Sequence, residues 1–122
     1  MFDIRVLQEP GEDGIRLGRI TVGRFKELFA CGFDDATVER LEERWRAELN
    51  LLVRGELAVA LVHDSRFAWI VYREGERCFV QQKLSLDGSF DELGPRETES
   101  DDGARISEWR TDIESIQAYL GA

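Results

Sequence analysis

The chain has 122 residues, 43% of them hydrophobic, which is enough for one domain with a substantial core and excludes a disordered chain. Its 25 acidic residues outnumber its 16 lysines and arginines, giving a formal net charge of −9. Such a surface repels nucleic acid and anionic membranes and attracts basic proteins, unless its only role is solubility. We therefore expect a single domain over residues 1–122 that binds neither nucleic acid nor membranes.

The two cysteines, Cys31 and Cys78, lie in apolar or strand-like segments without a CxxC spacing. A bridge between them is possible but not indicated, and two reduced, buried thiols are expected. Residues 1–5 lack the basic start and apolar run of a secretion signal, and no segment approaches the length of a transmembrane helix. These features predict a cytoplasmic protein.

The first elements in the chain are predicted strands. Residues 2–8 and 15–22 flank a dense turn signal, Pro-Gly-Glu-Asp-Gly, which is typical of a β-hairpin with a longer loop. Residues 24–31 are a candidate third strand, although Phe25 and Phe29 are also spaced as on a helix.

A long helix follows. Asp34 and Asp35 can cap its start, because a short carboxylate accepts the free backbone N–H groups of a first helical turn. The helix is predicted from about residue 36 to Arg54, and Gly55 is a plausible stop. Steps of three and four residues place one apolar stripe along it, formed by Val38, Leu41, Trp45, Leu49 and Leu52.

Three more strands come next. Residues 57–63 and 67–72 are nearly unbroken apolar runs, and residues 77–84 return after a Glu-Gly-Glu turn, which together make a β-meander. Because the first two runs are apolar on both faces, we expect them to be central strands covered on both sides.

Residues 85–104 then form a long predicted loop with few large apolar residues. Loops of this length in a compact domain are usually functional or disordered. The stretch 87–102 contains one basic residue, Arg96, and seven acidic ones: Asp87, Asp91, Glu92, Glu97, Glu99, Asp101 and Asp102. This stretch is either a contact surface for a basic partner or merely a solvated acidic loop.

The C-terminal part predicts a short strand at residues 106–110 and a final helix that ends at Gly121. Thr111 and Glu114 have the spacing of a capping box. Trp109 is expected in the core, with a role as an interface anchor as the alternative. The predicted fold class is α+β: a mostly antiparallel β-sheet of about six or seven strands, one long helix after the third strand and one short C-terminal helix.

Residues suited to catalysis are scarce. The single histidine, His63, ends an apolar strand, and its neighbours Asp64 and Ser65 do not form a triad, because adjacent strand residues point to opposite faces. We expect it to be a strand-end histidine with a satisfied hydrogen bond. There is no phosphate-binding or dinucleotide-binding glycine motif and no zinc or calcium ligand pattern. The sequence predicts no enzyme, no cofactor and no metal.

Four short segments in the second half carry a family resemblance. These segments are Trp-Ile-Val-Tyr-Arg-Glu-Gly from Trp69, Val-Gln-Gln from Val80, Pro-Arg-Glu-Thr from Pro95 and Ile-Ser-Glu-Trp from Ile106. In this order and spacing they resemble the immunity proteins of bacterial contact-dependent growth inhibition systems, the CdiI family. The resemblance covers about residues 67–120, with a looser match through the helix at Trp45.

The resemblance implies a function without catalysis. Members of this family bind and neutralise the toxic C-terminal domain of a large exported CdiA-type protein, often a nuclease, and thereby protect the producing cell. It implies a monomer in a 1:1 complex with this toxin domain. Nuclease clefts are basic, so the expected partner-binding residues are the seven acidic residues of 87–102. In an alternative interpretation, Arg96 and Glu97 do not contact the partner but pair with neighbouring residues and brace the loop. A second open alternative is whether inhibition occurs at the toxin's active site or away from it.

Two other functions remain open at this point. An acidic adaptor or chaperone-like binding module predicts a stable homodimer with several clients. An enzyme that acts through carboxylates predicts a deep pocket lined by two or more acids with raised pKa values.

Overall fold

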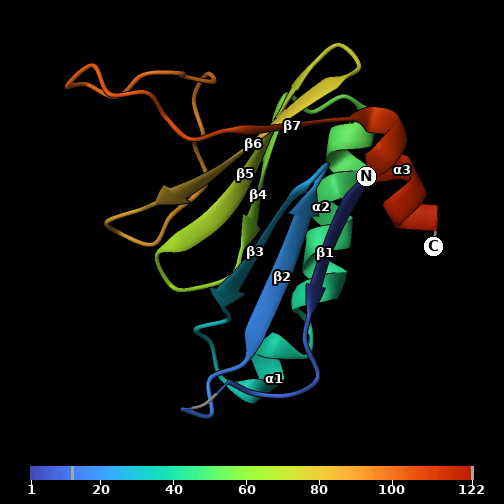
Figure 1. The fold of residues 1–122 in the computed structure, drawn as a ribbon, viewed down its shortest axis with the longest axis vertical. Helices are drawn as coiled ribbons and strands as arrows, with labels where there is room; N and C mark the ends of the chain where they lie inside the picture. The colour runs from blue at the N-terminus through green and yellow to red at the C-terminus, as the bar shows by residue number, and fades with distance from the viewer. Residues whose placement is uncertain (12, 122) are drawn as a thin grey trace.

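Within residues 1–11 and 13–121, which the computed structural model describes, seven strands and three helices form an α+β fold (Figure 1). This confirms the predicted fold class. The elements are β1 (Phe2–Val6), β2 (Leu17–Val22), β3 (Phe25–Ala30), α1 (Asp35–Val38), α2 (Leu41–Arg54), β4 (Ala58–Val62), β5 (Phe67–Glu74), β6 (Arg77–Leu84), β7 (Trp109–Asp112) and α3 (Ile113–Gly121).

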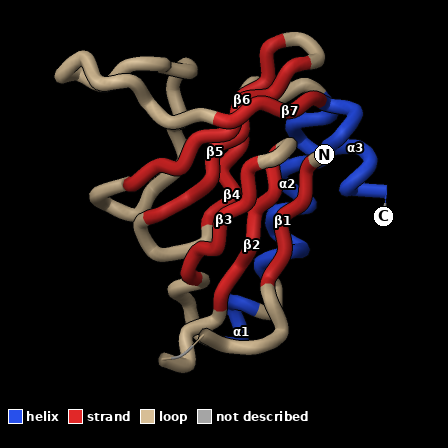
Figure 2. Tube along the Cα trace, viewed as in Figure 1, coloured by secondary structure: helices blue, strands red, loops and turns tan. Residues whose placement is uncertain are grey.

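The strands form two antiparallel sheets. One has the order β1-β2-β3 and the other β4-β5-β6-β7, and all neighbours within each sheet are antiparallel. The helical segment α1–α2 lies between β3 and β4 in the chain. These two strands do not pair with each other, so the two sheets are separate. In Figure 2, α2 passes behind β1 and β2, so the first sheet has one face toward the helices and one face away from them.

The predicted long helix is divided into two. Asp34 caps α1 as expected, because its carboxylate accepts the Thr37 N–H at 2.8 Å. The chain then tightens: the Arg40 N–H bonds to the Thr37 carbonyl three residues earlier, and the Arg40 backbone (φ −102°, ψ −3°) leaves the helical range before α2 begins. Gly55 ends α2 as predicted.

The main core lies between the first sheet, helices α2 and α3, and the inner face of the second sheet. Trp45 and Trp69 are almost completely buried there, and the Phe29 ring meets each of them edge-on at 5.9 Å between ring centroids. Gly18 makes room for this arrangement, since a Cβ there would lie only 2.3 Å from the Phe29 ring. Trp109 is half-buried and stacks on Phe25 at the margin of this core, as the core interpretation predicts.

The free edge of β1 is covered by side chains. The Val6 N–H donates to the Glu42 carboxylate of α2 at 2.9 Å, and the Tyr119 hydroxyl of α3 donates to the Ile4 carbonyl at 2.6 Å. The Phe2 and Tyr119 rings meet edge-on at 5.6 Å. These contacts blunt an edge that would otherwise pair with another strand.

The C-terminal elements begin later than predicted. The last strand spans Trp109–Asp112 instead of residues 106–110. The prediction of a capping box formed by Thr111 and Glu114 is also wrong. Thr111 pairs with Cys78 inside the sheet and its hydroxyl is buried, so it cannot reach the first turn of α3. The Asp112 carboxylate accepts the Ser115 N–H at 2.7 Å and caps α3 instead. In the described part of the chain, no helix is long and apolar enough to cross a membrane.

Candidate partner-binding surface

Residues 85–108, called the long loop below, connect β6 to β7 and cover the outer face of the second sheet. Phe90 and Leu93 pack there against a second, smaller apolar cluster. The buried members of this cluster are Ala68, Ile70, Tyr72 and Phe79. Both faces of β5 are therefore covered, and β5 is a central strand, as its apolar run predicts. The same prediction is wrong for residues 57–63, because β4 is the edge strand of the second sheet, although apolar residues cover both of its faces.

Arg96 anchors the long loop to the sheet. Its Nε and Nη2 atoms donate to both carboxylate oxygens of Glu108 at 2.7 and 2.5 Å, and Nη1 donates to Glu74 at 3.0 Å. The guanidinium also lies 3.6 Å from the centroid of the Phe79 ring. The hydrogen bonds from Arg96 lower the pKa of Glu108, and Glu108 raises that of Arg96. A bidentate pair over an aromatic face fixes the loop in one orientation.

Gln81 forms the second part of this anchor. It is completely buried, and its side-chain amide nitrogen donates to the Glu97 carbonyl at 2.8 Å and to Glu108 at 2.7 Å. The prediction that Arg96 braces the loop is therefore confirmed, and Glu97 takes part through its backbone only.

The four segments that carry the family resemblance meet at this anchor. Glu74, Gln81, Arg96 and Glu108 each belong to a different segment, and they form one hydrogen-bonded network. Sequence reasoning found the segments but not Gln81, Glu74 or Glu108 as partners of Arg96. A signal was present, since each of the other three segments contains a polar residue that can bond to the one basic residue of the stretch 87–102 or to its partner. These four residues thus hold the base of the loop in place, and the exposed side chains at its tip take no part in the network.

All seven predicted partner-binding acids are exposed. Three of them bind groups within the loop: Asp87 accepts from the Ser85 hydroxyl and the Ser89 N–H, Asp91 accepts from the Ser89 hydroxyl, and Asp102 accepts from the Ala104 N–H and the Ser100 hydroxyl. The hydrogen bond from Ser89 lowers the pKa of Asp87, and that from Ser100 lowers the pKa of Asp102. These three carboxylates shape the turns of the loop.

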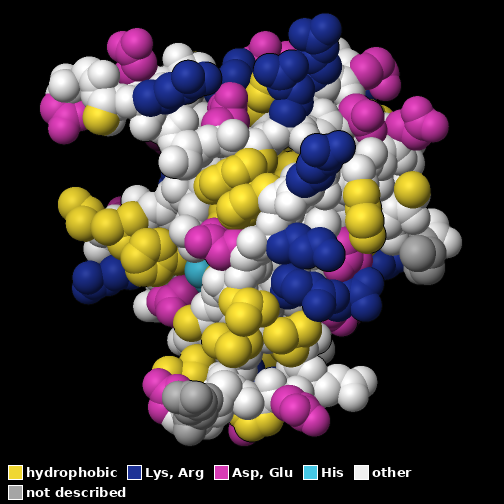
Figure 3. Space-filling model, viewed as in Figure 1, with side chains coloured by type: hydrophobic (Ala, Val, Ile, Leu, Met, Phe, Trp, Pro, Cys, Tyr) yellow, Lys and Arg dark blue, Asp and Glu magenta, His cyan; other side chains and the backbone are white. Residues whose placement is uncertain are grey.

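The other four acids are Glu92, Glu97, Glu99 and Asp101. Across residues 1–11 and 13–121, no hydrogen bond or ion pair holds any of their carboxylates. The Glu99 backbone forms an isolated β-bridge with Arg105, so the segment between them projects as a turn (Figure 1). Figure 3 shows acidic side chains at the end of this projection. The structure therefore presents a fixed base and an exposed acidic tip.

His63 and the cysteines have structural surroundings. His63 is buried, its Nδ1 lies 2.8 Å from the Ala30 carbonyl and its Nε2 lies 3.1 Å from the Gln82 amide, which confirms the expected satisfied histidine. Burial lowers its pKa. Cys31 and Cys78 are buried free thiols, as predicted, and burial raises the pKa of each to about 11. Both therefore remain protonated at neutral pH.

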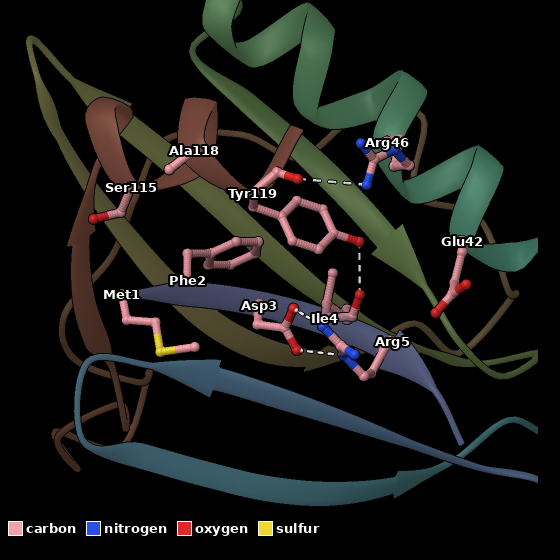
Figure 4. A pocket seen from close by; sticks show the side chains of 10 residues that line it. All are labelled: Met1, Phe2, Asp3, Ile4, Arg5, Glu42, Arg46, Ser115, Ala118 and Tyr119. Carbon is pink, nitrogen blue, oxygen red and sulfur yellow. Dashed lines mark hydrogen bonds and ion pairs between the residues drawn. The ribbon is translucent and has the colours of Figure 1, made fainter. Parts of the chain in front are cut away.

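A pocket of about 600 Å³ lies between β1, α2 and α3 (Figure 4). Its charged groups are engaged in contacts that brace the chain: Arg5 holds Asp3 with two hydrogen bonds of 2.7 and 2.8 Å. Arg46 donates to the carbonyls of Tyr119 and Leu120. In the part of the chain that the structure describes, no group of three or more potential metal-ligating residues comes together.

Comparison with known proteins adds two matches. The family model described as the CdiI N-terminal domain matches residues 34–119. A solved structure titled as a CdiA-CT/CdiI toxin and immunity complex from Enterobacter cloacae contains a chain with the same fold, with a TM-score of 0.79 and 23% sequence identity over 99% of this chain and 97% of that chain. No curated protein matches this chain.

Proposed function

Because the chain belongs to the CdiI family, we propose that it is an immunity protein that binds and neutralises the C-terminal toxin domain of a CdiA-type exported protein. The observation that carries this proposal is the family match over residues 34–119. The full-length similarity to a chain solved in a toxin–immunity complex supports it. The protein acts as a monomer in a 1:1 complex in the cytoplasm and performs no chemistry itself.

The toxin in this proposal is a nuclease with a basic cleft. The exposed tip of the long loop supplies carboxylates without internal partners, so their oxygens are available to accept from an arginine or lysine of the toxin. Asp87, Asp91 and Asp102 are part of the same surface, but they are oriented by the loop's own hydroxyl and N–H groups. Carboxylates placed where phosphates would bind block the substrate and accelerate association.

Co-expression tests the function directly. The toxin domain encoded immediately upstream of this chain is induced in cells with and without the immunity protein. We expect growth arrest without it, rescue with it, and co-purification of the two chains at one to one. Arrest in both strains, or no toxicity in either, contradicts the proposal and favours an adaptor role.

Charge reversal tests the surface. Glu92→Lys, Glu99→Lys and Asp101→Lys together should slow association with the toxin domain about tenfold or more and flatten its salt dependence, because rim charges act mainly on the association rate. The matched control reverses Glu9, Glu39 and Glu43, three exposed acids near α1 at the other end of the molecule, with the same change in net charge. Equal slowing in both variants would show that net charge matters and the loop surface does not.

A further inference from the structure

We propose that four exposed apolar residues, one at the start of the long loop and three beside it, form the anchoring contact for the toxin domain, and that the toxin presents there an apolar side chain ringed by basic residues. This inference rests on the proposed function and specifies its interface. The residues, called the groove patch, are Leu28, Phe67, Leu84 and Leu86.

The exposure of the groove patch is unusual. Leu86 is 83% exposed, Leu28 55%, Leu84 54% and Phe67 39%. Single apolar residues on a surface need no explanation, but several gathered at one place mark an interaction site. Figure 3 shows hydrophobic side chains gathered at the end of the β5–β6 pair, with a hollow between them and the acidic projection.

Strand register explains how the patch arises. Phe67 and Leu84 are directly opposite each other in β5 and β6, on the sheet face that carries Trp69 and Val71 in the main core. The strands run beyond the part of this face that the core covers, so their last apolar pair is left exposed. Leu28 of β3 and Phe67 line the same groove, of about 300 Å³, between the two sheets.

Contacts fix the backbone at the end of the β5–β6 pair and the Phe67 ring of the patch. The Ser85 N–H donates to the Arg66 carbonyl at 2.7 Å and extends the β5–β6 pairing past Leu84. The His63 ring lies parallel to the Phe67 ring at 6.3 Å, and His63 is itself fixed by the Ala30 carbonyl and the Gln82 amide. An ordered ring such as Phe67 on a fixed backbone loses little entropy on binding, which favours a tight contact.

The charges around the patch indicate the chemistry of the partner. Glu27 and Asp64 line the groove, and Asp87 follows Leu86 directly. Arg66 precedes Phe67, Lys83 precedes Leu84, and Arg19 lies opposite Leu28 in β2, so the excess of acids comes from the long loop. The remaining acids of the long loop continue from there along the chain. A partner that covers this surface must therefore bring positive charge around its apolar contact, which is the arrangement of an apolar centre inside a charged rim.

The patch and the acidic tip should have separable roles. Apolar contacts at the centre of an interface govern how slowly a complex dissociates, whereas rim charges govern how quickly it forms. Removing apolar surface should leave the salt dependence of binding unchanged.

The test replaces Leu84→Gln and Leu86→Gln in the full chain and measures binding to the toxin domain encoded immediately upstream. We expect the Kd to rise at least about tenfold through faster dissociation, with the wild-type salt dependence. The matched control is Ile15→Gln with Leu57→Gln, which are 44% and 74% exposed and belong neither to the groove patch nor to the long loop. The control should stay within about twofold of wild type.

A patch variant that binds like wild type, or a control that loses as much affinity, overturns the inference while the immunity function stands. A wild-type chain that does not bind the toxin domain overturns the proposed function and this inference with it. Thermal unfolding of both variants verifies that each is folded.

Discussion

The two apolar clusters of this protein are closed in different ways. The main core lies between regular elements, and the stripe of α2 supplies Leu41, Trp45, Leu49 and Leu52 to it. The smaller cluster, on the outer face of the second sheet, is closed by the irregular long loop through Phe90 and Leu93. Periodic apolar residues suffice for the first closure, whereas the second also needs Arg96 and its partners.

The difference separates the residues that maintain the fold from those that form the exposed surface. In the main core, replacing a buried side chain lowers the stability of the whole domain. In the long loop, a few polar contacts at the base fix the segment, and the tip has no role in packing. Stability and partner recognition are thus assigned to different residues of one short segment.

The largest effect is expected in the main core. Leu49 is completely buried, so Leu49→Ala should lower the free energy of unfolding by about 2–5 kcal/mol through lost burial and a cavity. Urea unfolding followed by tryptophan fluorescence measures it, and Leu51→Ala in the exposed part of the same helix should change stability by less than about 0.5 kcal/mol. A small effect of Leu49→Ala on the free energy of unfolding would contradict the view that the main core determines the stability of the domain.

An intermediate effect is expected at the anchor. Arg96→Met removes the bidentate pair with Glu108 and leaves that carboxylate with the Gln81 amide as its remaining partner, which should cost about 1.5–3 kcal/mol. Hydrogen exchange should accelerate most in residues 85–108 and on the outer face of the second sheet, because the loop opens as a local unit. The exposed Arg105→Met serves as control, and uniform acceleration across the whole chain would contradict a separate closure.

The smallest effect comes from the margin of the main core, at His63. Burial lowers the pKa of His63 in the folded protein, so the unfolded chain, with an ordinary pKa of about 6.5, binds a proton more readily. The stabilising effect of neutral His63 is complete above about pH 6.5 and is lost as the pH falls from there toward the folded-state pKa.

Unfolding by urea at pH 5.5 and 7.5 measures this effect. Wild type should lose more stability than His63→Gln over this interval, and one fully unbalanced proton sets the upper limit at about 1.4 kcal/mol per pH unit. His63 is the single histidine, so its replacement removes the main group that titrates in this range. The same pH dependence in both proteins would show that His63 takes up its proton without strain on the fold.

Local patterns predicted most of the fold. The β-hairpin, the meander of β4–β6 and the apolar stripe of α2 all follow from spacing within one element. The errors lie where distant residues decide. The position of β7 depends on pairing with β6, and the buried Thr111 shows that this pairing overrides a plausible local capping motif.

The candidate site was predictable only in outline. The acidic composition indicates an exposed loop, but the sequence does not show that Asp87 and Asp102 are engaged by their neighbours while Glu99 and Asp101 are not. The groove patch was missed entirely, because Leu28 and Phe67 come from different sheets and each has an ordinary position within its own strand.

The covered edge of β1 has a consequence for synthesis. The Tyr119 hydroxyl bonds to a carbonyl 115 residues earlier in the chain, so β1 leaves the ribosome long before its cover exists. Until α3 has emerged, the Ile4 carbonyl offers an open hydrogen-bonding edge to other nascent chains. The edge of β1 therefore stays exposed during translation until α3 has been synthesised and packs against it. A stalled chain that lacks α3 retains an edge that is prone to aggregation.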